Sequence, residues 1–254
     1  MGLIHSTAII SDKSYIGSNV RIGAYSIIED NVHICDDVEI EPFTYIGIKT
    51  NNKQINFKSN FLKINSYTII KSHSKIYQSS EIGKNCFIGH SVIIRENSIL
   101  KNNVQIGNNS EIQGDVVIDH DSKLQSNVFV SKFSNIGRYV WVLPGALLLN
   151  DKIPPSNNLS GPYLDDFSVI GANSKIMPNV KIAFATLIGA DSLVMADTRP
   201  LSLYFGSPAR YVSSLDDLNK KHHSSLYPWH LRFDKNYDQH ELKRIYENNI
   251  AKIY

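Results

Sequence analysis

The sequence predicts an all-β fold: a parallel β-helix of about ten triangular coils, followed by a small α-helical C-terminal tail. An aliphatic residue returns at every sixth position, a small or β-branched residue follows four positions later, and the pattern stops near residue 195. Six is a multiple of the two-residue period of a strand and fits no helical face. Each hexad is therefore predicted to be a short strand followed by a corner.

The aliphatic positions form three series, and three hexads make one coil. The first series is Ile4, Ile10, Ile16, Ile22, Ile28, Ile34, Ile40 and Ile46. The second is Ile64, Ile70, Ile76, Ile82, Ile88, Ile94, Leu100, Ile106, Ile112, Ile118, Leu124, Val130, Ile136, Val142 and Leu148. The third is Leu164, Ile170, Ile176, Ile182, Ile188 and Val194. Each coil is expected to bury these side chains against its neighbours, as in other solenoids.

The column of small residues is expected to fit beside the corners inside the prism. It includes Ala8, Ser14, Val20, Ser26, Val32, Val38, Thr44, Ser110, Val116, Ser122, Val128 and Ser134. Cys86 falls in the same column, so it is interpreted as a buried small apolar residue. Together with Cys35 it makes no disulfide framework, and a reducing, cytoplasmic location is expected.

Two interruptions and a tail complete the organisation. Gly47–Lys63 is polar, and is either one irregular coil or an excursion that rejoins in phase. Leu149–Tyr163 breaks the register and is rich in Pro, Asn and Ser, so it is predicted to project as a loop. The β-helix is expected to span residues 1–210, with loops near 47–63 and 149–163.

Residues 211–254 are expected to form a helical extension that packs on the prism or on a neighbouring subunit. A short helix is predicted over Leu215–His223, an aromatic extended segment over Tyr227–Phe233 and a helix over Tyr237–Tyr254. The last helix would place Leu242, Ile245, Tyr246 and Ile250 on one face.

Composition excludes several classes of protein. A net charge of +2 over 254 residues gives no argument for nucleic acid or an acidic membrane surface. The sequence contains no apolar run of the roughly 18 residues that a membrane span needs, and no signal peptide is expected at its start. His73, His90 and His120 lack the spacing of a metal site, so no metal is predicted.

Five segments carry a resemblance to a known family. Gly171–Val180, Ile188–Ser192 and Gly206–Arg210 resemble the last coils of the hexapeptide-repeat acyltransferases that act on sugars and sugar nucleotides. The opening Ile4–Ile9 resembles the start of the lipid A acyltransferases that act on UDP-N-acetylglucosamine, whereas Leu149–Ser156 resembles the loop of the amino-sugar N-acetyltransferases.

This resemblance covers about residues 4–210 and implies a left-handed winding. It also implies a homotrimer with active sites between subunits, and acetyl-CoA or another acyl-CoA as co-substrate. The function expected first is N-acetylation of a UDP- or dTDP-linked amino sugar for surface polysaccharide such as O-antigen. The alternatives are O-acylation of a UDP-sugar, as in lipid A synthesis, and a non-catalytic trimeric scaffold.

Acyl transfer needs a base for the nucleophile and a donor for the developing oxyanion. His120, in Val117–Asp121, resembles the catalytic histidine segment of the family and is the first candidate base. His90 is the rival, and the 30 residues between the two histidines put them on different faces of one prism. Asn127 shares the face of His90; it resembles an active-site asparagine, or it stabilises a corner.

Other candidates concern binding. Asn150 and Asp151 at the loop mouth are expected to hold the hydroxyls of the acceptor sugar. Asp121 is a further candidate for substrate contact or for orienting His120, a role that Asp119 could also take. Trp141, with Tyr139 at a corner near the loop, is expected either to stack on a base or to pack in an interface.

The cofactor candidates lie in the last coils and are carried over from the family or chosen for their charge. The resemblance implies that the amides of Ala172 and Ala190 bond the pantetheine arm. Arg199 and Arg210 are expected to meet the phosphates of the cofactor.

Overall fold

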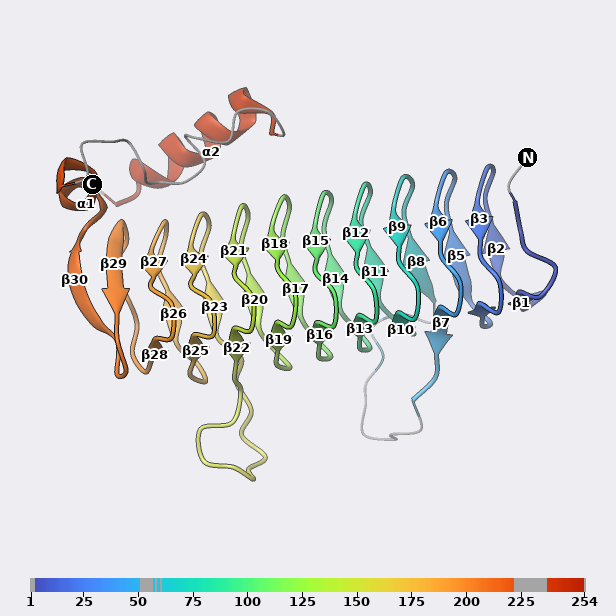
Figure 1. Cartoon of the computed structure of the whole chain (residues 1–254), viewed down its shortest axis with the longest axis horizontal. Coiled ribbons are helices and arrows are strands. Elements are labelled where there is room, and N and C mark those ends of the chain that lie inside the picture. Colours follow the sequence, from blue (N-terminus) through green and yellow to red (C-terminus); the bar gives the residue numbers. More distant parts are fainter. Residues whose placement is uncertain (1–2, 51–56, 58, 60, 222–236, 254) are drawn as a thin grey trace.

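The predicted parallel β-helix is confirmed by the computed structural model, which describes residues 3–50, 57, 59, 61–221 and 237–253. Three sheets of ten, nine and eleven strands form the faces of a triangular prism, and all their strands are parallel except the last strand of the third sheet. Figure 1 shows the short strands stacked along one axis, with the N-terminus at one end and β29 and β30 at the other.

The strands are two to five residues long and follow one another from sheet to sheet around the prism. The first sheet contains β1 (Ile9–Ile10), β4 (Ile27–Ile28), β7 (Tyr45–Ile48), β10 (Lys75–Tyr77), β13 (Ile93–Ile94), β16 (Glu111–Ile112), β19 (Phe129–Val130), β22 (Leu147–Leu148), β25 (Lys175–Ile176) and β28 (Leu193–Val194). The second contains β2 (Tyr15–Ile16), β5 (Val32–Ile34), β8 (Leu62–Ile64), β11 (Glu81–Ile82), β14 (Ile99–Leu100), β17 (Val117–Ile118), β20 (Asn135–Ile136), β23 (Tyr163–Leu164) and β26 (Lys181–Ile182). The third contains β3 (Arg21–Ile22), β6 (Glu39–Ile40), β9 (Ile69–Ile70), β12 (Phe87–Ile88), β15 (Gln105–Ile106), β18 (Lys123–Leu124), β21 (Trp141–Val142), β24 (Val169–Ile170), β27 (Leu187–Ile188), β29 (Ser202–Phe205) and β30 (Arg210–Ser214).

The interior is the aliphatic column predicted from the six-residue period. Ile118 pairs with Ile136 one coil later, and both are 0% exposed. Burial of each such side chain contributes about 1.5–3 kcal/mol, so the stack of coils is itself the core. The small column completes it: Ser122 Oγ donates to the carbonyl of Gly137 at 2.7 Å, and Cys86 is buried as predicted.

Most corners bend through a residue with positive φ, a conformation that asparagine and aspartate tolerate better than most residues. We call the bend from the first to the second sheet the first corner; it includes Asn97, Asp115 and Phe133. The second corner, between the second and third sheets, includes Asn103, Asp121, Tyr139 and Phe167. The third corner, which returns to the first sheet, includes Ser91, Asn109 and Asn127.

Both interruptions leave the prism at the first corner. Ile34 pairs with Ile64, so Gly47–Lys63 contains an excursion that rejoins in phase and not one irregular coil. Residues 51–56, 58 and 60 of it lie outside the described residues. Leu149–Tyr163 projects as predicted between β22 and β23, and Ile136 pairs with Leu164 across it.

The end of the prism extends further than the hexads indicate. After Val194, β29 continues the third sheet in parallel with β27, and β30 returns antiparallel to β29. The division between residues 210 and 211 stays a prediction, although β30 crosses it. The extended segment predicted over Tyr227–Phe233 lies outside the described residues.

The described part of the tail contains two helices, α1 (Leu215–Lys221) and α2 (Gln239–Ile250). Asp238 caps α2, since its side chain accepts the backbone N–H groups of His240 and Glu241. Leu242 and Ile245 are buried against Tyr139, Phe167 and Phe184 of the same chain. Helix α2 therefore packs along the second corner, and Figure 1 shows it lying beside the prism.

Candidate active site

His120 lies at the second corner, directly before Asp121, and lines a cavity of about 700 Å³. The floor continues one coil later with Gly137 and Arg138, and Asn135 and Tyr163 of the second sheet form a wall. Asn249 of α2 and Lys252, two residues after the end of α2, also line the cavity. The C-terminal tail is therefore part of this cavity.

The contacts of His120 fix which ring nitrogen carries the proton. The backbone N–H of Asn102 donates to Nδ1 of His120 at 3.2 Å. A nitrogen that accepts a hydrogen bond is unprotonated, so the neutral ring has its proton on Nε2. The same ring is 40% exposed, which leaves it accessible from the cavity.

The two aspartates beside His120 play different parts. Asp119 Oδ1 accepts the backbone N–H of His120 at 2.7 Å and lies 3.8 Å from the Nε2 atom of the ring. Asp121 Oδ1 instead accepts the side-chain amide of Asn103 at 3.0 Å. Asp119 is thus the carboxylate that faces the donor nitrogen of the ring.

Arg138 and Asp166 form a second charged pair in this cavity, which the sequence analysis missed. The guanidinium donates to Asp166 Oδ2 from Nη2 at 2.8 Å and from Nε at 3.2 Å, and the backbone N–H of Arg138 donates to Oδ1 at 2.7 Å. Although burial opposes the charge, the bond to Asp166 raises the pKa of Arg138 above its ordinary value. Arg138 follows His120 by 18 residues, one coil, so the repeat itself contained the signal.

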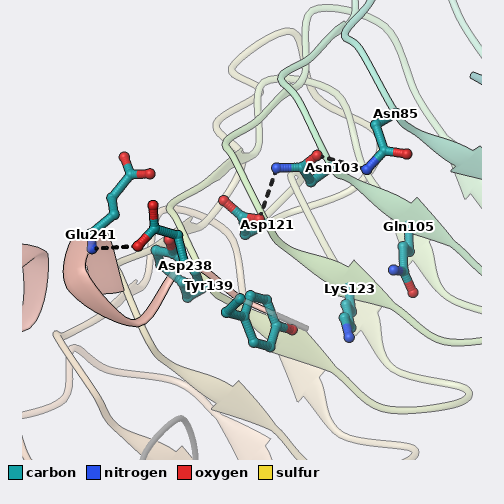
Figure 2. Close-up of a pocket in the computed structure, with 9 residues that line it drawn as sticks. Asn85, Asn103, Gln105, Asp121, Lys123, Tyr139, Asp238 and Glu241 are labelled. Carbon is teal, nitrogen blue, oxygen red and sulfur yellow. Dashed lines mark hydrogen bonds between the residues drawn. The ribbon is translucent and has the colours of Figure 1, made fainter. Parts of the chain in front are cut away.

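A smaller cavity of about 210 Å³ lies on the other side of the same corner, under the start of α2. Figure 2 shows Asn85, Asn103 and Asp121 in a row, joined by side-chain hydrogen bonds of 3.0 Å each. Glu241 of α2 lines the same cavity. Burial raises the pKa of Asp121, and the charge of Glu241 acts in the same direction.

His90 and Asn127 lie at the third corner, away from His120 in one chain. Nδ1 of His90 is 2.8 Å from Ser72 Oγ and 3.9 Å from Glu41 Oε2. Asn127 has a φ of 60° and makes the bend of its coil. His90 and His120, which were expected on different faces of the prism, therefore lie at different corners of it.

Asn150 and Asp151 lie in the loop at the first corner. The Asp151 carboxylate accepts the backbone N–H of Ser156 at 2.8 Å and its hydroxyl at 2.7 Å. These bonds lower the pKa of Asp151. Asn150 Nδ2 donates to the carbonyl of Lys132 at 3.2 Å. Both side chains hold the loop in its present form.

The cofactor candidates divide between two corners. Ala172 and Ala190 lie at the third corner, where a Cβ on Gly171 would come within 2.5 Å of the Ala190 amide nitrogen. Arg210 begins β30 and pairs with Phe205 of β29. Arg199 instead lies at the second corner, 5.8 Å from the ring of Tyr211.

The placement of Trp141 and Tyr139 corrects the sequence analysis. They lie on the third sheet and at the second corner, whereas the loop leaves the first corner. Tyr139 is 2% exposed because it stacks on Phe167 and packs under α2, and Trp141 packs against the same cluster. The position near the loop was wrong because the order of the corners was not followed around the coil.

The described part of the chain contains neither a group of metal ligands nor a membrane-spanning helix. In residues 3–50, 57, 59, 61–221 and 237–253, no three His, Cys, Asp or Glu side chains are grouped as metal ligands. Within the same residues, neither helix is long and apolar enough to cross a membrane.

Comparisons with known proteins agree with the repeat. The model of the GMPPB C-terminal domain matches residues 58–166, and that of the bacterial transferase hexapeptide (six repeats) matches residues 13–47. The chain is 37% identical to an acyl-[acyl-carrier-protein]–UDP-N-acetylglucosamine O-acyltransferase of Chlamydia caviae, over 36% of this chain and 33% of that protein. It is 30% identical to the protein of the same name from Thermodesulfovibrio yellowstonii, over 37% of this chain and 51% of that protein.

The chain thus spans about half the length, or less, of these curated relatives. Among solved structures, the Arabidopsis UDP-N-acetylglucosamine acyltransferase superposes with a TM-score of 0.70 at 15% identity, over 87% of this chain and 77% of that one. This likeness concerns the fold. From the repeat, the three-sided prism and these likenesses together, we conclude that the chain is a parallel β-helix built from hexapeptide repeats like those of the bacterial transferases, and that part of it is similar in sequence to UDP-N-acetylglucosamine O-acyltransferases.

Proposed function

We propose that this protein transfers an acyl group from a thioester to a hydroxyl of a UDP-linked amino sugar, with His120 handling the proton. The observation that carries the proposal is His120 itself, an accessible imidazole in a polar cavity of about 700 Å³ with Asp119 beside it. Histidine is the usual proton acceptor near neutral pH, and a cavity of this size accommodates a sugar.

The names of both curated relatives favour O-acylation over the N-acetylation expected first from the loop sequence. A hydroxyl is a weaker nucleophile than an amine and is far from ionised at neutral pH. A base placed within hydrogen-bond reach of it is therefore worth more, typically 10²–10⁴-fold in rate. A positioned histidine is therefore expected to accelerate O-acyl transfer more than N-acyl transfer.

The proposed step breaks one bond and forms one. The sugar oxygen bonds to the thioester carbonyl carbon as its proton passes to His120. Collapse of the tetrahedral intermediate then breaks the carbon–sulfur bond, and the imidazolium returns the proton to the departing thiolate. Asp119, 3.8 Å from Nε2, stabilises the imidazolium between these events.

Base catalysis requires the ring of His120 to leave Asn102. In the structure the lone pair of Nδ1 accepts the Asn102 N–H, and Nε2 carries the proton. At 3.2 Å the bond lies at the upper end of the usual range, and such a bond contributes only about 0.5–1.5 kcal/mol net, so the cost of breaking it is small. We expect the bound acceptor to draw the ring into the cavity.

The same proposal includes the identity of the acyl donor and the oligomeric state of the protein. The relatives' names favour an acyl carrier protein as donor, and acetyl-CoA or another acyl-CoA is the alternative. We expect a homotrimer in the cytoplasm, acting in lipid A or other surface polysaccharide synthesis. The candidate residues at the first and third corners lie away from His120 in one chain. They can contribute to the same active site only if another copy of the chain places its own first or third corner beside His120.

The test is acyl transfer to UDP-N-acetylglucosamine, followed by mass spectrometry of the product, with acyl carrier protein and acyl-CoA compared as donors. His120→Ala is expected to lower kcat/KM by 10²–10⁴-fold. His90→Ala, at another corner, tests the rival candidate and is expected to stay within about twofold if His120 is the base. If neither variant loses activity, the proposed role of His120 as the base fails. If the wild-type protein acylates no sugar nucleotide with either donor, a catalytically silent scaffold is the better interpretation.

A further inference from the structure

Helix α2 contributes to the His120 cavity although it is remote from it in sequence. Asn249 and Lys252 line the cavity together with His120 and Arg138. The docking of α2 is well defined, because Tyr246 lies edge-on to Phe167 with ring centroids 5.7 Å apart and 5.5 Å from the ring of Phe184. The end of the helix is therefore held over the cavity.

Asn249 connects α2 to the charged pair on the floor. Its Nδ2 donates to Asp166 Oδ2 at 3.3 Å, the same oxygen that accepts Nη2 of Arg138. The Asp166 side chain is only 11% exposed. It fits there because residue 137 is glycine: a Cβ at Gly137 would lie 2.7 Å from Asp166 Oδ1. Asn249, Asp166 and Arg138 thus form one network beside His120.

The charges around the cavity indicate what kind of ligand it takes. Lys101, Arg138 and Lys252 are balanced by Asp119, Asp165 and Asp166. A lining with no net charge gives little attraction to a diphosphate, whereas paired carboxylates and guanidinium groups suit hydroxyls, which both donate and accept. Tyr163, which is 39% exposed, adds an aromatic surface on which a pyranose ring can pack.

We infer that α2 forms part of the acceptor site, with the sugar ring between its C-terminal end and the second corner. Asn249 acts there as a positioning residue, since with Asp166 it orients Arg138 toward the sugar. The inference deepens the proposed function and rests on it, because it takes the acceptor to be a sugar nucleotide.

The test is calorimetric titration of the full-length protein with UDP-N-acetylglucosamine and, separately, with UDP, in the absence of any acyl donor. Asn249→Ala and Arg138→Lys are expected to raise the Kd for the sugar nucleotide about 5–20-fold and to leave that for UDP within twofold. Arg138→Lys keeps the charge but loses the fork that grips Asp166. In turnover, both variants are expected to raise the acceptor KM and to leave the donor KM within twofold.

Lys243→Ala is the matched control, because Lys243 lies on the outer side of α2 with its side chain 74% exposed. It is expected to bind both ligands as the wild type does. Thermal melting within about 2 °C of the wild type shows that a variant keeps its fold.

The outcomes separate the two proposals. Equal binding of the sugar nucleotide by the wild type, Asn249→Ala and Arg138→Lys overturns the role of α2 alone. An equal loss for UDP and the sugar nucleotide shows that Arg138 reads the diphosphate, which overturns the assignment to the sugar. A wild-type protein that binds neither ligand overturns the proposed acceptor class and this inference together.

Discussion

The backbone N–H of Asn102 lies one coil before His120 at the second corner and donates to its Nδ1 atom. This relationship makes the resting ring a donor through Nε2. It also separates two roles that a histidine could have in acyl transfer. A base must be unprotonated, whereas a donor to the oxyanion also acts when the ring is protonated.

The pH dependence of kcat/KM distinguishes these roles. If His120 is the base, kcat/KM is expected to fall tenfold per pH unit on the acid side, because one proton inactivates the ring. Rates of acyl transfer between pH 5 and 9 provide the measurement, and the profile of His90→Ala, measured in parallel, shows whether the rival histidine contributes. A rate that stays level on the acid side contradicts the base role and leaves His120 as a donor.

Asp121 is expected to reduce stability at neutral pH. Burial, helped by Glu241, raises its folded-state pKa above 3.8, the ordinary value for an aspartate. The carboxyl therefore binds its proton more tightly in the folded protein than in the unfolded one. This tighter proton binding stabilises the folded state. The stabilisation is fully present below pH 3.8 and is lost as the pH rises through the folded-state pKa of Asp121.

Asp121→Asn removes this effect and keeps an oxygen for the amide of Asn103 to bond. The variant is expected to be more stable than the wild type at pH 7 by a few tenths to about 1 kcal/mol, or roughly 1–3 °C in Tm. The difference should disappear near pH 3, where the carboxyl is protonated in both states. Thermal melts at the two pH values measure it, and a less stable variant at pH 7 would show that the charged bond from Asn103 outweighs burial.

The six-residue period predicted the interior because it depends only on residues close in sequence. Ile118, Ile136 and Cys86 were assigned correctly without knowledge of any distant contact. The period also separated His90 from His120. It did not order the three corners, which is why Trp141 and Tyr139 were placed near the wrong loop.

The site needed information that the period does not contain. Asp166 follows Arg138 by 28 residues instead of 18, because the loop at Leu149–Tyr163 is inserted between them. The docking of α2 could not be predicted either, since Leu242 and Ile245 fit many apolar surfaces. One signal was available: Tyr139 and Phe167 place aromatic rings at corner positions where asparagine is common, and α2 covers both.

The two cysteines are expected to differ sharply toward thiol reagents. Burial raises the pKa of Cys86 from 9.0 to about 11, which alone lowers its thiolate fraction about 100-fold. Cys35 is only partly buried. In the native protein at pH 8, an aromatic disulfide reagent is expected to titrate one thiol quickly and the second only after denaturation. Cys35→Ser should abolish the fast phase, and a fast phase that survives this change would contradict the interior position of Cys86.

Asn127 allows its two interpretations, catalysis and a corner role, to be separated. Its φ of 60° suits glycine at least as well as asparagine, whereas a β-branched residue there is strained by about 1–2 kcal/mol. If Asn127 only makes the bend, Asn127→Gly is expected to keep kcat/KM within twofold and stability within about 0.5 kcal/mol.

Asn127→Val is expected to lower the free energy of unfolding by about 1–2 kcal/mol, measured by urea denaturation. Asn109→Gly, on the same corner one coil earlier with a φ of 56°, serves as the matched control. A loss of tenfold or more in kcat/KM for Asn127→Gly, with Asn109→Gly unaffected and both variants stable, would show that the Asn127 side chain takes part in the reaction. Because Asn127 and His120 lie at different corners of one chain, that result would also require a second copy to complete the active site.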